Sequence, residues 1–215
     1  MAKNVVLQRE STKQLALLSM FAAIIVLLAF TPIGFIPLGF MKATIIHVPV
    51  IIGSIMLGPR MGAILGGLFG LTSLITNTTL PVITSFVFSP LIPVPGLGRG
   101  SLLALVVCFV PRILVGVFPW LAYHGVQKLI KKKNSTVALA IAGIVGSMTN
   151  TLLVMHLIYF LFQGAYAAVK EVTVQAVYGI ILSVILINGI PEAIVACILS
   201  AAVCKALMAL NFNQS

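Results

Sequence analysis

Long apolar runs with almost no charged residues are the feature that most constrains the fold of this chain. Between Lys13 and Lys42, for example, lie 28 residues that carry no charge. Charged residues make up only 7% of the 215 residues and hydrophobic residues make up 60%, whereas a soluble domain has about 25% charged residues. So few polar residues could not cover a water-soluble protein. The sequence therefore predicts an integral membrane protein and excludes soluble enzymes, nucleic-acid-binding proteins and disordered scaffolds.

Six segments are predicted to form transmembrane helices, because a helix needs about 20 residues to cross the apolar part of a bilayer. Their expected bounds are 14–30, 43–57, 61–80, 101–130, 137–163 and 173–207. Within the fourth segment, Pro111 and Arg112 are expected to separate an outer half-helix from the main span, and Pro191 is expected to bend the sixth. The predicted fold class is all-α, with six transmembrane helices in one integral membrane domain that comprises residues 1–215.

Residues 81–100 are predicted to form a long outer loop, since their four prolines and three glycines exclude a continuous helix. The loop is nevertheless apolar, with Phe86 and Phe88 near its start. An apolar loop beside a membrane is best explained as a lid over a cavity or as a re-entrant segment. A second break, at residues 32–42, is expected to be a loop or the bent end of the first helix.

The third predicted helix is rich in glycine, with Gly62, Gly66, Gly67 and Gly70 in its sequence. Small residues at such spacing allow the backbone of a neighbouring helix to approach closely within a membrane. We therefore expect the third helix to pack tightly against another helix of the bundle.

The basic residues lie in the connections between the apolar segments rather than on one soluble face. With the N-terminus inside the cell, nine of them fall on the cytoplasmic side and three on the outer side, which predicts that both termini are cytoplasmic. The nine inner residues are Lys3, Arg9, Lys13, Arg60, Lys128, Lys131, Lys132, Lys133 and Lys205, and the three outer ones are Lys42, Arg99 and Lys170. The net charge of +10 therefore indicates orientation in a membrane and not a nucleic-acid partner.

Arg112 and Glu192 are the two charged residues predicted to lie inside the membrane, where a charge costs about 2.5–3.5 kcal/mol on insertion scales. Asn150, His156 and Asn188 are expected at a similar or more external depth on the fifth and sixth helices. These polar groups predict a ligand cavity among the last three helices that opens outward toward the proline-rich loop. The alternative is structural, an Arg112–Glu192 ion pair with Asn150 as a hydrogen-bonding contact between helices.

Two further polar residues are candidates for contact with a ligand. His47 lies near the outer end of the second predicted helix, and Asn77 lies at the outer end of the third, beside the proline-rich loop. Each also has a structural interpretation, His47 as a hydrogen-bonded packing residue and Asn77 as a cap of the helix end.

Motifs for catalysis and metal binding are missing from the sequence. It contains no phosphate-binding loop for ATP hydrolysis and no His-Glu-x-x-His motif, and its three cysteines lie inside apolar runs as small core residues would. Ser147 with His156 weakly resembles an intramembrane serine protease. Nine positions on one helix, however, place the two side chains on opposite faces. No enzyme activity, cofactor or metal is predicted.

Several runs of the sequence together resemble one family of membrane proteins. The most specific are residues 45–60 (IIHVPVIIGSIMLGPR) and 110–116 (VPRILVG), followed by 85–90 (SFVFSP) and 188–193 (NGIPEA). With six helices, termini inside and glycines along the third helix, the chain resembles the substrate-binding S component of an energy-coupling factor (ECF) vitamin transporter. Within that family it looks most like the pantothenate-type members, and the resemblance covers nearly the whole chain.

The resemblance implies a binding subunit without a motor of its own, in the plasma membrane of a prokaryote. Such a subunit binds its vitamin from outside with high affinity and associates with a transmembrane coupling subunit and two cytosolic ATPases. Toppling of the S component then carries the vitamin inward. The family docks through two alanines four positions apart on the first helix. Here Ser19 and Ala23 have that spacing, and Ala16 belongs to the same face.

Pantothenate has one carboxylate, two hydroxyl groups and an amide, so its site needs one cation and several neutral hydrogen-bonding groups. Arg112 could bind the carboxylate through two parallel hydrogen bonds. Asn150 and Asn188 could bind the hydroxyls or the amide, and Glu192 could orient the arginine. Two alternatives remain open, an S component for another water-soluble vitamin and a self-sufficient secondary transporter of a small anionic metabolite.

Overall fold

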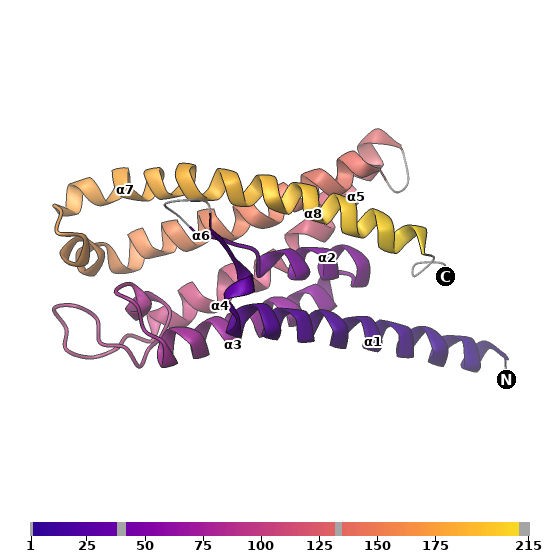
Figure 1. Cartoon of the computed structure of the whole chain (residues 1–215), viewed down its shortest axis with the longest axis horizontal. Coiled ribbons are helices and arrows are strands. Elements are labelled where there is room, and N and C mark those ends of the chain that lie inside the picture. Colours follow the sequence, from indigo (N-terminus) through magenta and orange to yellow (C-terminus); the bar gives the residue numbers. More distant parts are fainter. Residues whose placement is uncertain (1, 38–41, 132–134, 211–215) are drawn as a thin grey trace.

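The computed structural model describes residues 2–37, 42–131 and 135–210, which form an elongated bundle of helices (Figure 1). Five helical stretches in this part of the chain are long and apolar enough to cross a membrane. They are Thr12–Phe30, Pro59–Thr79, Leu103–Ile130, Thr136–Lys170 and Val174–Ala209. The shorter apolar helix α2 (His47–Leu57) packs among them. The helical architecture agrees with the sequence analysis, while the count of six membrane spans stays a prediction.

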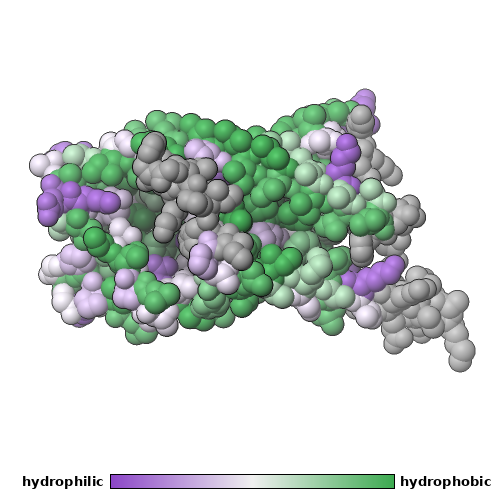
Figure 2. Space-filling model, viewed as in Figure 1, coloured by the Kyte–Doolittle hydropathy of each residue, from purple (hydrophilic) through white to green (hydrophobic). Residues whose placement is uncertain are grey.

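Apolar side chains cover the outside of the bundle and also fill its core. Figure 2 shows hydrophobic residues over the middle of the visible face and hydrophilic residues toward its two ends. Leu27, Ile64 and Leu186 are large hydrophobic residues with more than half of their surface exposed. An apolar surface of this extent suits lipid and not water, as expected of a multi-pass membrane protein.

The first helix, α1 (Ala2–Phe30), ends at the predicted residue but begins well before the predicted residue 14. Its apolar part packs on the bundle through Phe21, Ile25 and Leu28, which recur every three or four residues and are buried. The polar residues that precede the apolar run continue the same helix.

The connection between α1 and α2 contains a short β-ribbon. After the η1 turn (Pro32–Gly34), β1 (Phe35–Pro37) pairs antiparallel with β2 (Lys42–Thr44). This ribbon departs from the all-helical prediction. It also moves the start of α2 to His47, four residues after the predicted start, because residues 42–44 are paired as a strand.

The fourth predicted span consists of two helices, α4 (Leu103–Val115) and α5 (Phe118–Ile130), with the break at Gly116. The expected break at Pro111 was wrong, because Pro111 lies inside α4. A proline inside a helix removes one backbone hydrogen bond and leaves one carbonyl without its usual donor. In this helix a side chain bonds that carbonyl instead, so the helix continues through the proline.

The glycines of α3 (Pro59–Thr79) bring it close to α4 and to the turn after α4. A Cβ atom added at Gly62 would collide with the backbone of Gly116, and one added at Gly66 would collide with the carbonyl of Arg112. The close approach predicted from the glycine spacing is thereby confirmed for these two positions. It places the middle of α3 directly beside Arg112.

The helix α6 (Thr136–Lys170) continues past the predicted end at residue 163 and is kinked at Phe162, whose backbone is not helical. It packs closely on the last helix, since a Cβ atom at Gly143 would meet the carbonyl of Ala196. At this position the backbones of α6 and α8 are therefore in close contact.

The last span is irregular in the middle. After the η3 turn (Val174–Ala176) it consists of α7 (Val177–Val184), the π-helical turn η4 (Ile185–Gly189) and α8 (Ile190–Ala209). The sequence predicted a bend at Pro191, and the irregular turn ends just before that residue. Proline has no N–H for the regular pattern, and a wide π turn accommodates the missing hydrogen bond.

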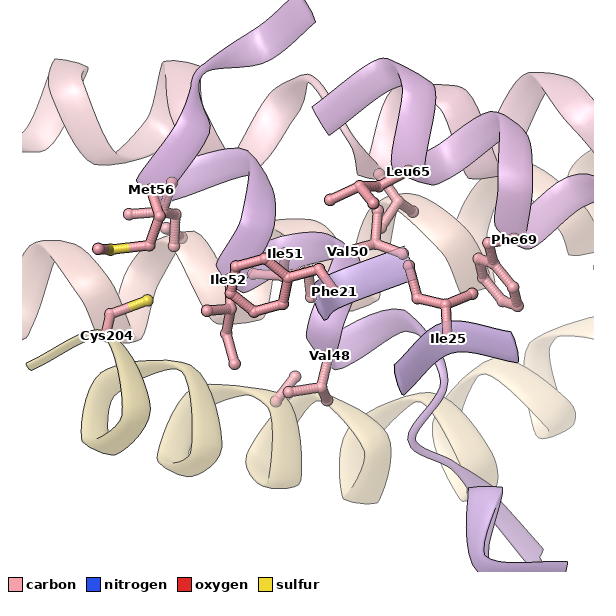
Figure 3. Close-up of a cluster of buried hydrophobic side chains, with 14 of the residues drawn as sticks. Phe21, Ile25, Val48, Val50, Ile51, Ile52, Met56, Leu65, Phe69 and Cys204 are labelled. Atoms are coloured by element: carbon pink, nitrogen blue, oxygen red, sulfur yellow. The ribbon is translucent and has the colours of Figure 1, made fainter. Parts of the chain in front are cut away.

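The helix α2 is at the centre of one hydrophobic cluster of the bundle. Every residue from His47 to Met56 is buried, as expected of a helix that is apolar on nearly all sides. Around it pack Phe21 and Ile25 of α1, Leu65 and Phe69 of α3, and Cys204 of α8 (Figure 3).

The two ends of the bundle differ in the segments they contain (Figure 1). The N-terminal end of α1, the C-terminal end of α8 and the C-terminal end of α5 lie at the same end of the bundle. The proline-rich segment before α4 and the α6–α7 turn lie at the opposite end. Two of the basic residues used for the orientation argument, Lys132 and Lys133, fall outside the described residues.

Candidate ligand-binding site

A cavity of about 440 Å³ lies near the end of the bundle that contains the proline-rich segment. This volume is within the range of about 300–1,000 Å³ that is typical of small-molecule sites. Its walls come from the end of α1, β2, the residue before α2, the C-terminal half of α3, the proline-rich segment, α4 and α6. The lining residues are Ala29, Thr44, Ile46, Phe69, Thr72, Ser73, Thr76, Asn77, Leu80, Val82, Phe88, Arg112 and Asn150.

Arg112 supplies the positive charge of the cavity. Its residue is 6% exposed, and its Nη1 donates a hydrogen bond to the carbonyl oxygen of Val107 at 2.8 Å. Val107 is four residues before Pro111, so this is the carbonyl that the proline leaves without a backbone donor. The neighbouring Pro111 therefore creates the acceptor that holds the guanidinium against α4.

Two aromatic rings flank the same guanidinium. Its central carbon lies 5.0 Å from the ring centroid of Phe88 and 5.6 Å from that of Phe69, both within the range of a cation–π contact. The buried Nε has no hydrogen-bond partner. With Nη1 bonded to the backbone and two rings close to the central carbon, Nε is a buried donor whose hydrogen-bonding capacity is not used by the described residues.

Glu192 does not neutralise Arg112 in the structure. Its Oε1 accepts a hydrogen bond from the backbone N–H of Thr44 at 2.9 Å, and its Oε2 accepts one from the hydroxyl of Thr151 at 3.3 Å. The described side chains contain no ion pair between Arg112 and Glu192. The structural alternative considered from the sequence, an ion pair between these two residues, is therefore not formed, and Glu192 does not orient the arginine.

The two predicted asparagines in the cavity have different roles. The side chain of Asn77 donates to the carbonyl of Ser73 at 2.8 Å and accepts from the hydroxyl of Ser85 at 2.8 Å. Asn77 thus joins α3 to the proline-rich segment. Asn150 of α6 has a buried Oδ1 without a partner, and such an atom is normally satisfied by a ligand or a water molecule.

The proline-rich segment is packed against the bundle at its start. The η2 turn (Ser85–Val87) is buried, and the ring of Phe86 meets that of Phe162 edge-on at 6.0 Å. Ser89 shares a hydrogen bond of 2.7 Å with Thr78 of α3. The segment is part of the cavity wall through Val82 and Phe88, whereas its movement as a lid stays a prediction.

Four of the predicted ligand residues lie outside the cavity lining. His47 is 1% exposed at the start of α2 and neither ring nitrogen has a partner. His156 bonds the carbonyl of Leu152, and its ring faces Tyr178. Asn188 lies on the η4 turn. The carboxylate oxygens of Glu192 accept hydrogen bonds from Thr44 and Thr151.

The hydroxyl residues of the cavity were not among those predicted from the sequence. Thr72 and Ser73 are adjacent on α3, Thr76 lies one turn later, and Thr44 lies at the end of β2. The hydroxyls of Thr72 and Thr76 donate to backbone carbonyls of their own helix, which leaves their oxygens as acceptors for a ligand. The serine and threonine residues that repeat at positions 72–79 are the signal that could have predicted this wall.

Comparison with known proteins decides the family. A family model described as "ECF transporter, substrate-specific component" matches residues 13–204, which is most of the chain. The chain belongs to this family. As an S component it is part of a transporter and not an enzyme, in agreement with the resemblance found in the sequence.

Two curated relatives of this S component have names that refer to one vitamin. The chain is 38% identical over 210 residues to the pantothenic acid transporter PanT of Lactococcus lactis subsp. cremoris, which covers 97% of this chain and 100% of the relative. It is 30% identical over 216 residues to the pantothenate transporter PanT of Leuconostoc mesenteroides subsp. mesenteroides, with 94% and 95% coverage. The pantothenate-type resemblance is thereby confirmed.

The predicted docking face of the S component lies on the outside of α1. Ala16, Ser19 and Ala23 are all exposed. They lie on the side of the helix opposite to the buried Phe21 and Ile25, because residues two positions apart on an α-helix differ by about 200°. The bundle of this chain therefore leaves this small-residue face uncovered.

Proposed function

We propose that this S component binds pantothenate in the cavity beside Arg112 and delivers it to an ATP-driven ECF importer. The observation that carries the proposal is the guanidinium of Arg112, which lines the cavity, has no acidic partner among the described side chains and keeps a buried Nε without a hydrogen-bond partner. A buried cation without a counter-ion is unfavourable, and the carboxylate of an incoming ligand would supply the missing charge.

The rest of the cavity matches the remaining groups of pantothenate. Its hydroxyl and amide hydrogens need acceptors, which the oxygens of Thr72, Thr76 and Asn150 provide. Its methyl groups need apolar walls, which Ile46 and Leu80 provide. Both relatives named above are pantothenate transporters, which favours this vitamin over other water-soluble ones.

We further propose that α2 crosses the membrane as a sixth, short span and that both termini are cytoplasmic in the plasma membrane of a prokaryote. The N-terminal end of α1 and the C-terminal ends of α5 and α8 lie at the same end of the bundle (Figure 1). Lys13, Lys128 and Lys205 lie toward this end, as expected of a cytoplasmic side. The cavity then faces the outside.

Transport itself requires partners in this proposal, because the sequence has no nucleotide-binding motif. The uncovered face of Ala16, Ser19 and Ala23 would contact a transmembrane coupling subunit, which in turn binds two cytosolic ATPases. The side chains at these three positions are small, so a partner helix can approach α1 closely there.

The proposal is tested by binding and by reconstitution. Purified protein in lipid nanodiscs should bind pantothenate, and should bind pantothenol, which has an alcohol in place of the carboxylate, at least about tenfold more weakly. In liposomes the chain alone should bind without accumulating pantothenate, and addition of the coupling subunit, the ATPases and ATP should start uptake. Uptake by the chain alone in an ion gradient would instead identify a self-sufficient carrier, and selective binding of a different vitamin would correct the substrate.

A further inference from the structure

The carboxylate of Glu192 joins three elements that are distant in the sequence. It accepts the backbone N–H of Thr44 from β2, 148 residues away, at 2.9 Å. It also accepts the hydroxyl of Thr151 from α6 at 3.3 Å. Glu192 itself belongs to the first turn of α8, directly after the π-helical turn. One side chain thus connects the α1–α2 connection to two of the long helices.

The bond to Thr44 fixes a wall of the cavity. Thr44 and Ile46 both line the cavity, whereas Glu192 does not. Between them, Ile45 donates its N–H in the other direction, to the carbonyl of Gly34 at 3.0 Å. The strand end is therefore held from two sides, by its own ribbon and by Glu192. Of these two attachments, only the one to Glu192 connects the wall to the rest of the bundle through a hydrogen bond.

The two hydrogen bonds just described are what stabilises the buried carboxyl group of Glu192. This residue is 9% exposed in the apolar part of the chain, where an acidic residue is unfavourable unless its oxygens are bonded. Among the described side chains it has no cationic partner. Both of its oxygens are instead occupied by donors from β2 and α6, which leaves neither directed to a ligand.

We propose that Glu192 is a positioning residue that holds the Thr44–Ile46 wall of the ligand cavity against α6 and α8 and does not touch the ligand. The effect on binding rests on the proposed function, since it requires that the cavity bind pantothenate. Without the carboxylate, the wall separates from the bundle more often, so a bound ligand leaves faster. The preference for a carboxylate-bearing ligand is unaffected, because Arg112 provides it.

The attachment is tested first without ligand, by hydrogen exchange of the peptide that covers residues 42–46. Wild type and Glu192→Gln should show the same slow exchange, since the amide oxygen still accepts the Thr44 N–H. Glu192→Ala should exchange at least about tenfold faster at Thr44, because a charge-assisted hydrogen bond is lost. Equal protection in wild type and Glu192→Ala would overturn the proposal. If Glu192→Ala does not fold, Glu192→Met gives the same reading with a side chain of similar length.

The second test measures dissociation of pantothenate and the ratio of its affinity to that of pantothenol. Glu192→Ala should release pantothenate about tenfold faster or more, Glu192→Gln should remain within about threefold of wild type, and both should keep the wild-type ratio. Glu171→Ala is the matched control, because Glu171 is an exposed acid at the end of α6. A changed ratio in either Glu192 variant would show direct ligand contact and would contradict the proposal. If wild type binds no pantothenate, the proposed function fails, whereas the exchange experiment still decides the role of Glu192.

Discussion

Arg112 donates a hydrogen bond to the carbonyl of Val107, the one carbonyl of α4 that Pro111 leaves without a backbone donor. The proline and the arginine are consecutive in the sequence, so one short motif both creates an acceptor and supplies the group that uses it. The bond keeps α4 continuous and at the same time holds the guanidinium at the cavity. This relationship determines the first two predictions.

Replacing Arg112 should separate carboxylate recognition from the other contacts. Because a buried hydrogen bond to a charged group contributes about 1.5–3 kcal/mol, Arg112→Ala should weaken pantothenate binding by about one to two orders of magnitude in a calorimetric titration. Arg112→Lys should restore it only in part, since an ammonium group does not form two parallel hydrogen bonds. The Ala variant should no longer distinguish pantothenate from pantothenol. A folded Ala variant that retains this discrimination would show that another group binds the carboxylate.

Replacing Pro111 should weaken pantothenate binding through its effect on Arg112, and not through a contact between Pro111 and the ligand. Pro111→Ala returns a backbone N–H to the Val107 carbonyl, which then competes with the Nη1 of Arg112 for the same oxygen. We expect pantothenate affinity to fall about fivefold, the equivalent of about 1 kcal/mol for one hydrogen bond, while the protein remains at least as thermostable. The control is Pro59→Ala, because Pro59 lies in the first turn of α3, where its missing N–H has no helical partner to lose. Equal affinities in both variants would contradict this role of Pro111.

The neighbouring glycines of α3 offer a matched pair of substitutions. A Cβ atom at Gly66 would collide with the carbonyl of Arg112, whereas one at Gly67 would meet nothing. Gly66→Ala should therefore destabilise the protein by about 1–3 kcal/mol, as overpacking does, and should weaken ligand binding by displacing Arg112. Gly67→Ala should leave binding unchanged and stabilise the helix by up to about 1 kcal/mol. Thermal unfolding and titration of both variants check the pair, and equal effects at the two positions would show that α3 and α4 are not in backbone contact.

The exposed face of α1 should be needed for transport and not for binding. Ser19→Trp and Ala23→Trp place bulky side chains where a partner helix would approach, so each should abolish ATP-dependent uptake while pantothenate affinity stays within about twofold of wild type. Ile24→Trp is the control, since Ile24 is also exposed but lies beside this face rather than on it. Normal uptake by both the Ser19 and Ala23 variants would place the docking surface elsewhere.

Much of the helical architecture was predictable because membrane insertion depends on local sequence. A span requires a continuous apolar run of about 20 residues, and such runs are visible without any knowledge of their neighbours. The long helices α3 and α6 followed from this rule, whereas the end of α1 at Phe30 followed from the prolines and glycines after it. The ribbon of β1 and β2 did not, because its backbone pairing joins residues on the two sides of a turn and leaves no hydropathy signal.

The partners of the buried polar residues were decided by tertiary structure alone. The sequence placed Arg112 and Glu192 at similar depth, and opposite charges at one depth suggest an ion pair. Packing separates them, because the glycines of α3 bring α4 to one side of the cavity, while the π turn before α8 and the contact with α6 direct Glu192 to Thr44 and Thr151. The same packing excludes His156 and Asn188 from the cavity lining and includes the hydroxyls of α3.

The sequence by itself determined that the chain is a helical membrane protein, that Arg112 is a buried cation, and that the chain resembles a vitamin-binding S component. These conclusions depend only on residue types and on their succession along the sequence. Which face of each helix meets which neighbour was decided only in the folded bundle. In a membrane protein nearly every face of a helix is apolar, so hydrophobic periodicity does not distinguish the face that meets lipid from the face that meets another helix.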